Sequence, residues 1–586
     1  MTTTISSRPS TTRRHAALGA VLALLFTQLF AAAAQTAAAQ TAAAQTAAAQ
    51  TAVQRAAVAA PDRYGAEVAE SVMRSGGNAV DAAVATAFVL AVTFPEAGNL
   101  GGGGFITLKM GTATAFLDFR EVAPQAASRD MYLDAAGKPI PGASLIGHRA
   151  AGVPGTVAGL WEAHRKYGSR PWPELLQPAI RLARDGFVPP QPLIDSVAES
   201  LADYAGKTNF AEYFGKVGNR RFKQPELARA LQRIAERGSA GFYSGRTADL
   251  IVAEMRRGNG LITHADLAAY RAIWREPLSV RWRNYTLVSA PPPSSGGIAL
   301  VQLLRMKDAL AKDFAGVPHN SATYVHLIAE ISKRVFADRA EYLGDPDFVR
   351  VPVAALTDEG YLQRRAAEVR RDAISPLGVV KPGLAESAET THFSILDGEG
   401  NAVALTYTLN GGFGSGVVVK GAGFLLNNEM DDFSTKPGVP NLFGVVGGVA
   451  NEIHPGKRML SSMTPTLLLE NDRVRMVLGT PGGSTIFTSV FQTMVNRLDF
   501  GMSAVGAVAA ARFHHQLLPP TLIVHSRCCA LGDERTRADL KTLGYDVKQS
   551  PWEFGDMQLI DVDAKGVVTA AADPRGRGVA RVFDTR

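Results

Sequence analysis

Two adjacent threonines, Thr390 and Thr391, stand where a loop-like stretch gives way to a strand-like alternation. Pro, Gly, Ser and Ala are prominent in residues 372–389, which is typical of an exposed connection, whereas THFSIL alternates apolar and polar residues. A chain cut before Thr390 would leave its hydroxyl beside a free α-amino group, whose ordinary pKa of about 7.7–8.0 suits a base. The position therefore suggests an N-terminal threonine nucleophile, although a Thr pair before a strand is usually only structural.

Two further segments supply groups that such a nucleophile needs. The turn DGEGN after THFSIL predicts a β-hairpin whose second strand, AVALTYT, brings Thr408 beside Thr390. PGGS, residues 481–484, lies between an expected strand and an expected helix, so the N–H groups of Gly482 and Gly483 can face a developing oxyanion. Taken alone, PGGS is more simply a helix-start turn or a phosphate nest, but no Walker lysine follows the glycines.

Other catalytic chemistries find weaker support in the residues. His514 and His515 form the only histidine pair, but no G-x-S-x-G elbow accompanies them, and GFGSG at residues 412–416 has the wrong order. We therefore interpret the two histidines as packed structural residues. The histidines show no H-E-x-x-H spacing or similar cluster, so neither a metal ion nor another cofactor is expected.

The elements around these residues alternate between helical and strand-like patterns. Two packed helices are expected over residues 64–73 and 78–92. The glycines at 101–104 lead into a strand and open no helix, so they do not form a dinucleotide-binding loop. Residues 155–371 read mainly as helices with polar faces, and the chain after Thr390 reads as strands followed by a long helix. Such a chain of 586 residues predicts stacked α and β layers.

Composition excludes several classes of protein. Hydrophobic residues make up 46% and charged residues 20% of the chain, which indicates a folded protein over most of its length. The net charge of +7 comes without a long Lys/Arg run or a nucleic-acid motif, so no nucleic-acid partner is expected. The two cysteines, Cys528 and Cys529, are neighbours, and a bond between them would close a strained ring. We therefore expect neither a disulfide framework nor a Cys-based metal site.

The N-terminus has the layout of a secretory signal. Three arginines among the first 14 residues precede an apolar run that ends in small residues just before Gln35. We predict a cleaved signal peptide over residues 1–34, and hence export to a bacterial periplasm or secretion, with an uncleaved anchor as the rival interpretation. A QTAAA repeat then predicts a low-complexity spacer over residues 35–60, so that the folded part begins near Pro61.

The segment TTHFSILDGEGNAVALTYTLNGGFG, which starts at Thr390, resembles the processing-site signature of the γ-glutamyltranspeptidase family. Further segments resemble family segments in family order: GGNAVDAAVA, PEAGNLGGGGF, DFRE, APPPSSGG, LLNNEMDDFS, KPGVPNLFGVVGG, KRMLSSMTPT, GTPGGS and ARFHHQ. The resemblance covers nearly everything from Pro61 to Arg586. It implies an α+β fold, the four-layer αββα sandwich of the N-terminal-nucleophile hydrolases, built from two subunits cut from one precursor between Glu389 and Thr390.

The resemblance also implies the subunits and the reaction. A large subunit, residues 61–389, and a small catalytic subunit, residues 390–586, would stay together as a heterodimer. Thr390 would attack the γ-amide carbon of glutathione or another γ-glutamyl compound, and the resulting ester would pass to water or to an amino acid or dipeptide acceptor. Two alternatives remain: a cephalosporin or glutaryl-amide acylase of the same fold, and a non-catalytic secreted binding protein.

Single positions match the family's site through these segments. Arg120 in DFRE matches the residue that holds the substrate α-carboxylate, a task that suits a forked guanidinium. Phe443 departs from the pattern, because bacterial relatives often have tyrosine there and phenylalanine cannot donate a hydrogen bond, so we expect hydrolysis to be large relative to transfer. The other matched positions are two hydroxyl partners of the carboxylate, three groups for the α-amino end and two glycines of the oxyanion hole: Ser461 and Ser462; Asn410, Glu429 and Asp432; Gly482 and Gly483.

Overall fold

The structure is a computed structural model, and it describes residues 55–376, 389–434, 448–529, 531–550 and 552–585. The predicted signal peptide, residues 1–34, and most of the predicted spacer lie outside the described residues. Within the described ranges, no helix is long and apolar enough to cross a membrane.

The spacer prediction is wrong at its C-terminal end. Arg55–Ala60 forms a strand, β1, whose last five residues are buried in the larger sheet. Its sequence, RAAVAA, continues the small-residue texture of the QTAAA repeat, so the pattern contains no boundary at Arg55. In the fold these small side chains fit a strand that is covered on both faces. The sequence of the strand alone does not reveal that it is covered.

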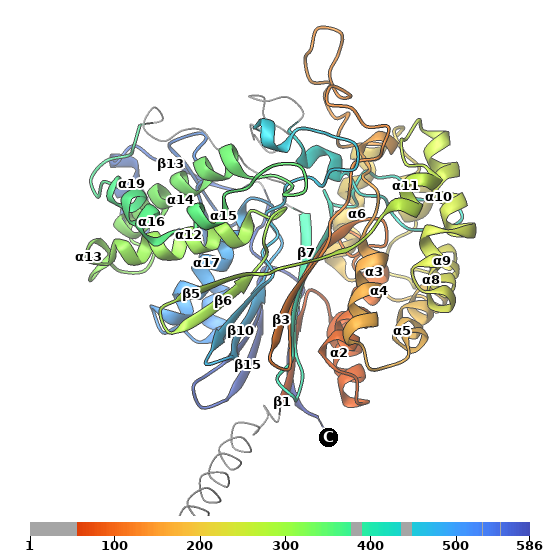
Figure 1. Cartoon of the computed structure of the whole chain (residues 1–586), viewed down its shortest axis with the longest axis horizontal. Helices are drawn as coiled ribbons and strands as arrows, with labels where there is room; N and C mark the ends of the chain where they lie inside the picture. The colour runs from red at the N-terminus through yellow and green to blue at the C-terminus, as the bar shows by residue number, and fades with distance from the viewer. Residues whose placement is uncertain (1–54, 377–388, 435–447, 530, 551, 586) are drawn as a thin grey trace, which may run out of the picture. The chain divides into compact units, whose positions relative to one another are not determined.

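The larger of two stacked sheets has seven strands, and every neighbouring pair is antiparallel (Figure 1). β7, in which all residues but Glu389 follow the expected cut, and β8 lie between β1 and β2, which precede the cut. Strands from both expected subunits therefore share one hydrogen-bonded sheet. The order is β16 (Val579–Asp584), β1, β7 (Glu389–Leu396), β8 (Ala402–Asn410), β2 (Gly103–Met110), β3 (Ala113–Phe119) and β4 (Ile273–Arg275).

The second sheet has six antiparallel strands. Its strand β10 packs against β7 and β8 of the first sheet, and its strand β14 packs against β7. A small third sheet joins β11 (Phe513–His514), β12 (Leu522–His525) and β13 (Asp546–Gln549). The order of the six-stranded sheet is β15 (Val568–Ala572), β14 (Gln558–Val562), β10 (Arg473–Gly479), β9 (Thr466–Glu470), β6 (Tyr285–Ser289) and β5 (Leu278–Trp282).

One group of helices covers the outer face of the seven-stranded sheet, as Figure 1 shows in orange and yellow. The two helices expected near the N-terminus are confirmed, and all fifteen residues of α3 are buried. The group consists of α2 (Arg63–Arg74), α3 (Ala79–Thr93), α4 (Thr156–Tyr167), α5 (Trp172–Asp185), α6 (Gln191–Tyr204), α7 (Phe210–Phe214), α8 (Pro225–Arg237), α9 (Ala240–Tyr243), α10 (Gly245–Arg257) and α11 (His264–Ala269).

A second group of helices covers the six-stranded sheet, shown mainly in green and blue (Figure 1). Together the two groups and the two sheets make the four layers αββα, so the predicted fold class is confirmed. This group consists of α12 (Gly296–Ala309), α13 (Ala311–Phe314), α14 (Ala322–Tyr342), α15 (Val353–Leu356), α16 (Glu359–Ala367), α17 (Thr485–Leu498), α18 (Ala504–Ala509) and α19 (Glu534–Thr542).

The hairpin of β7 and β8 shows the expected period of two. Phe393 and Ile395 enter the core beneath the first group of helices. Ser394 points to the other side, where its hydroxyl donates to the carbonyl of Gln558 on β14 at 3.0 Å. Because successive side chains of a strand alternate between faces, Thr390 falls on the face towards the second sheet. The nucleophile candidate thus lies between the sheets.

The two neighbouring cysteines are bonded to each other. Cys528 and Cys529 are joined by a disulfide in the structure. The bond closes within two residues, so it links no distant segments and provides no framework for the fold.

Candidate active site

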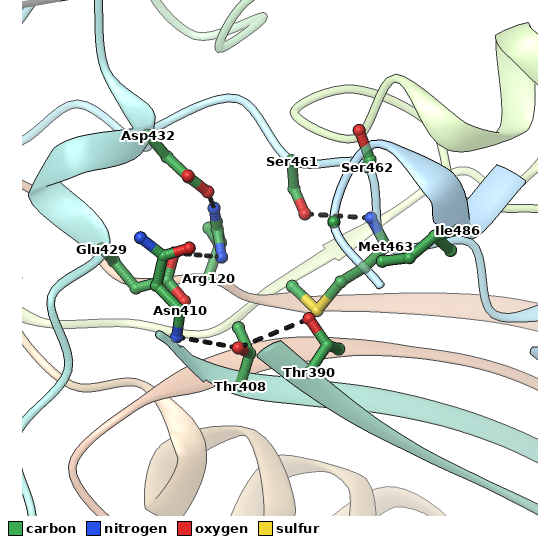
Figure 2. A pocket seen from close by; sticks show the side chains of 11 residues that line it. Arg120, Thr390, Thr408, Asn410, Glu429, Asp432, Ser461, Ser462, Met463 and Ile486 are labelled. Carbon is green, nitrogen blue, oxygen red and sulfur yellow. Dashed lines mark hydrogen bonds and ion pairs between the residues drawn. The ribbon is translucent and has the colours of Figure 1, made fainter. Parts of the chain in front are cut away.

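Thr390 lies at an irregularity of the β7–β8 ladder. The antiparallel register shifts between Glu389 and Thr391, where two steps along β7 face three steps along β8, so the extra residue of this β-bulge lies on β8 opposite Thr390. Bulges commonly occur beside active sites, where they re-aim side chains. The Thr390 hydroxyl donates to the Thr408 hydroxyl oxygen at 3.5 Å, and the backbone N–H of Asn410 donates to the same oxygen at 2.8 Å (Figure 2). The predicted contact of Thr408 with Thr390 is therefore present, and Thr408 is itself fixed by the strand end.

Arg120 stands directly after β3 and is 1% exposed. Its Nη1 atom lies 2.7 Å from Glu429 Oε2, and its Nη2 atom donates to Asp432 Oδ2. Both carboxylates belong to one short 3-10 helix, Glu429–Asp432, which presents them on the same side. The guanidinium is thus held between two buried acids, and Figure 2 shows the three side chains meeting on one wall of the pocket. Separately placed positive and negative groups are what a zwitterion needs.

The neighbouring Glu121 is completely buried behind Arg120. Among the described residues, neither of its carboxylate oxygens has a hydrogen-bond partner, and Oε2 lies 3.7 Å from Arg120 Nη1. Burial raises the pKa of the Glu121 carboxyl to about 8, although the charge of Arg120 opposes the shift. Glu121 is therefore largely protonated at neutral pH, and it adds no full negative charge beside the pocket.

Ser461 and Ser462 lie in the segment before β9 and line the side of the pocket across from Arg120. Figure 2 shows the Ser461 hydroxyl directed into the pocket and the Ser462 hydroxyl directed the other way. The Ser461 backbone N–H donates to the carbonyl of Pro293 at 2.9 Å, so the loop before α12 holds this segment in place. The Ser461 hydroxyl oxygen accepts from the backbone N–H of Met463 at 3.1 Å. That contact leaves the Ser461 proton available to a ligand.

Gly482 and Gly483 form the turn between β10 and α17, as PGGS predicted. Their φ angles are +130° and +54°, a region that favours glycine. A Cβ atom on Gly482 would lie 2.4 Å from the Thr485 hydroxyl oxygen, which itself donates to the Gly482 carbonyl at 2.6 Å. α17 begins at Thr485, so both glycine N–H groups stand at a helix N-terminus, where anions are stabilised.

The pocket gathers most residues that the sequence singled out. Gly482 adjoins Gly483 without lining the pocket, and Glu389 is described only as part of β7. Two apolar residues complete the wall, Met463 and Ile486, and both belong to the core between the sheets. Nothing in the sequence distinguishes these two from ordinary core residues. The predicted residues that line the pocket are Arg120, Thr390, Thr408, Asn410, Glu429, Asp432, Ser461, Ser462 and Gly483.

Asn451 was not anticipated from the sequence, yet it joins the two sides of the pocket. Its side-chain amide donates to the backbone carbonyl of Asp432 at 2.7 Å, and its side-chain oxygen accepts from the backbone N–H of Leu460 at 3.0 Å. Asn451 is buried. One amide thus sets the spacing between the acid-bearing turn and the segment that leads to Ser461.

The rival catalytic groups do not reach the pocket. His514 contacts Thr488 and Gln516 at 3.0 Å each, and burial lowers its pKa to about 4. His515 is also buried, and its pKa is lowered to about 3. Among the described residues, no group of three His, Cys, Asp or Glu side chains could hold a metal ion. The predicted lid residue Phe443 lies outside the described residues.

The two stacked sheets, with a threonine on an inner strand beside a glycine turn, define an N-terminal-nucleophile hydrolase. The family model described as Gamma-glutamyltranspeptidase matches residues 65–583. The chain therefore belongs to the γ-glutamyltranspeptidase family.

Relatives of known name agree with this membership. The glutathione hydrolase proenzyme of Pseudomonas aeruginosa is 59% identical over 527 residues, which cover 90% of this chain and 94% of the relative. A solved γ-glutamyltranspeptidase from Pseudomonas nitroreducens, complexed with L-DON, is 56% identical with a TM-score of 0.55 and covers 55% of this chain and 97% of its own. The cephalosporin acylase from Bacillus halodurans has a TM-score of 0.77 at 25% identity and covers 90% of this chain and 95% of its own.

Proposed function

We propose that this chain is a self-processing γ-glutamyltransferase and glutathione hydrolase whose nucleophile is Thr390. One observation carries the proposal: the Thr390 hydroxyl opens into the same pocket as a buried cation, two buried acids and two serines. That set of groups fits the α-amino and α-carboxylate ends of a glutamyl donor. The membership of the family and the 59% identical glutathione hydrolase proenzyme support the same reaction.

The first reaction is maturation. The Thr390 hydroxyl attacks the carbonyl carbon of Glu389, the peptide C–N bond breaks, and the Thr390 nitrogen takes up a proton as an ester forms on its own hydroxyl. Water then hydrolyses the ester, which frees the hydroxyl and a new α-amino group. A large subunit of residues 61–389, extended by β1, and a small subunit of residues 390–586 remain associated. β7 and β8 support this, since they are hydrogen-bonded to β1 and β2.

The second reaction uses the same hydroxyl. The free α-amino group of Thr390 accepts the hydroxyl proton while the oxygen attacks the γ-amide carbon of the donor. The N–H groups of Gly482 and Gly483 would bind the oxyanion, and such donors are typically worth about 2.7–4 kcal/mol each. The amine leaves with the proton, and the γ-glutamyl ester passes to water or to the amine of an amino acid or dipeptide. Thr408 holds the nucleophile in place during both steps.

Donor binding requires Arg120 to change partners. The α-carboxylate takes the place of one acid on the guanidinium and also receives the hydroxyl protons of Ser461 and Ser462. The α-ammonium group of the donor then neutralises the acid that Arg120 released, Glu429 or Asp432, with the side chain of Asn410 beside it, while Arg120 keeps the other acid. Every buried negative group thus keeps a positive neighbour, which a buried site demands.

The acylase alternative is less well supported. A glutaryl chain has no α-amine. When its carboxylate binds Arg120, the chain would therefore offer no positive partner to Glu429 and Asp432. The solved acylase also resembles this chain at only 25% identity. Comparing turnover of γ-glutamyl and glutaryl anilides separates the two activities.

The proposal includes export to a periplasm or secretion, because the N-terminal residues have the layout of a secretory signal.

Thr390→Ala tests the proposal against a matched control, Thr391→Val. The Thr391 hydroxyl is buried and has no hydrogen-bond partner among the described residues, so its loss leaves the site intact. We expect the control to mature and turn over a γ-glutamyl anilide, and we expect Thr390→Ala to remain one uncut, inactive chain on a denaturing gel. A normally cut Thr390→Ala protein, or a second N-terminus other than Thr390, would refute the assignment. A single uncut band from the unmodified protein would favour the non-catalytic binding protein.

The balance between hydrolysis and transfer follows from Phe443. Without a tyrosine hydroxyl to close over the site, we propose that water competes well with acceptors. Product release from a γ-glutamyl anilide should therefore rise little when glycylglycine is added at neutral pH. Strong stimulation by the acceptor would count against this part of the proposal.

A further inference from the structure

A second arginine lies buried behind the two serines of the pocket. Arg339, near the end of α14, is 4% exposed. Its Nε atom donates to the Ser295 hydroxyl oxygen at 2.9 Å, and its Nη2 atom donates to the Ser462 hydroxyl oxygen at 3.4 Å. It therefore touches a pocket residue without lining the pocket itself.

Ser295 connects Arg339 to the other serine. Its backbone N–H and its hydroxyl both donate to the carbonyl of Ser461, at 2.7 and 2.8 Å. Ser295 is buried and immediately precedes α12, in the loop APPPSSGG. Because Ser295 accepts from Arg339 and donates to Ser461, it transmits the position of the guanidinium to the backbone of the serine pair.

The hydrogen bonds show what the two serines can offer a ligand. Ser461 accepts from the backbone N–H of Met463, and Ser462 accepts from Arg339. Each hydroxyl thus already accepts one hydrogen bond from the protein, and its proton lies on another side of the oxygen. The hydroxyl oxygen of Ser295 lies 3.4 Å from that of Ser462, and because the Ser295 proton is committed to Ser461, the Ser462 hydroxyl is the donor in this long contact. An anionic carboxylate can receive both protons, that of Ser462 in exchange for the long contact with Ser295.

We propose that Arg339 is a positioning residue for the α-carboxylate of the donor, acting through Ser295 and Ser462. It holds both serines in the orientation in which they donate, and its positive charge makes the Ser462 proton a better donor. The carboxylate then lies between Arg120, which binds it directly, and Arg339, which acts from behind the serines. This inference rests on the proposed function.

The test measures KM and kcat of Arg339→Gln and Arg339→Lys with two anilides. γ-Glutamyl anilide carries the α-carboxylate, and 4-aminobutyryl anilide keeps the amine but lacks the carboxylate. For γ-glutamyl anilide we expect KM to rise about tenfold or more with kcat nearly unchanged, because one hydrogen bond to a charged group is lost. For 4-aminobutyryl anilide KM should barely change, so the enzyme's preference for a donor with the α-carboxylate falls. The double variant Arg339→Gln/Ser462→Ala should have a KM for γ-glutamyl anilide no higher than that of the more damaging single variant, because both changes remove the same interaction.

Arg365→Gln is the matched control, because it removes a half-buried arginine that binds Asp338 of α14 at 3.1 Å and does not touch the serines. It should leave both KM values unchanged. Ser295→Ala serves as a second variant if the Arg339 variants do not mature, since it keeps the cation and removes only the link; its KM should rise for γ-glutamyl anilide alone. Unchanged KM, or equal losses with both anilides, would overturn the inference. No γ-glutamyl turnover by the unmodified enzyme would instead overturn the proposed function.

Discussion

Replacing Arg120 by lysine tests how the pocket recognises its donor. Arg120 binds Glu429 and Asp432 through two different nitrogens, and its Nε atom donates to the Met459 carbonyl at 3.4 Å. A lysine keeps the charge but has a single ammonium group on a flexible stem. It can satisfy one acid or one ligand oxygen at a time, so the fork that receives the α-carboxylate is lost.

The expected magnitude follows from the contacts. One hydrogen bond between charged groups contributes about 1.5–3 kcal/mol, and each 1.4 kcal/mol is tenfold in affinity. Losing one arm of the fork should therefore raise KM by about 10- to 100-fold. The value of kcat should change much less, because the reacting γ-carbon lies at the other end of the glutamyl group, beside Thr390.

The assay is γ-glutamyl anilide hydrolysis over a range of donor concentrations. Arg275→Lys is the matched control, because Arg275 also bridges two acids, Asp118 at 2.8 Å and Asp347 at 2.7 Å, but does not line the pocket. Maturation should be checked by gel for both variants. An unchanged KM for Arg120→Lys, or a fall confined to kcat, would refute the role of the fork.

Three further predictions concern the nucleophile, the oxyanion turn and the buried acid. Thr408→Val should lower kcat about 10- to 100-fold, since it removes the hydroxyl that holds Thr390; unchanged kcat would contradict this. Gly482→Ala should lower kcat about 100-fold or more with a smaller effect on KM, because its Cβ would lie 2.4 Å from the Thr485 hydroxyl oxygen and displace the turn; wild-type kcat would exclude Gly482 from the oxyanion hole. Glu121→Gln should alter how stability depends on pH. The folded pKa of Glu121 is raised to about 8, so between about pH 5 and 8 the folded chain keeps a proton that the unfolded chain releases. As the pH rises through this range, the free energy of unfolding should fall more steeply for the chain with Glu121 than for Glu121→Gln, by about 1.4 kcal/mol per pH unit. Urea unfolding of the uncut Thr390→Ala chain, with and without Glu121→Gln, measures both slopes. Equal slopes would contradict the raised pKa of Glu121.

Several parts of the fold could be predicted because neighbouring residues decide them. The hairpin after Thr390 follows from strand alternation around DGEGN, and the start of α17 follows from a glycine turn. The helices α2 and α3 follow from apolar spacing. Each of these depends on residues that are close together in the sequence, and the longest reach is the 18 residues between Thr390 and Thr408 in the hairpin.

Other parts could not be predicted locally. β1 reads as a continuation of the QTAAA repeat, and only its pairing with β7 and β16 makes it a strand of the central sheet. Met463 and Ile486 resemble any core residues until the sheets stack around them. Arg339 reads as one charged residue in a helix of polar appearance, and its burial against Ser462 depends on how α14 packs.

The sequence by itself predicted the nucleophile and indicated the class of reaction, since Thr390 stands at a loop-to-strand join within a long and specific motif. The tertiary structure alone decided how the substrate groups meet. Arg120 precedes Asp432 by 312 residues, and they touch because β3, the short helix after β8 and the segment before β9 end at one place between the sheets. Contacts between residues so far apart in the sequence depend on how whole layers pack. No local sequence pattern encodes the distances between these side chains.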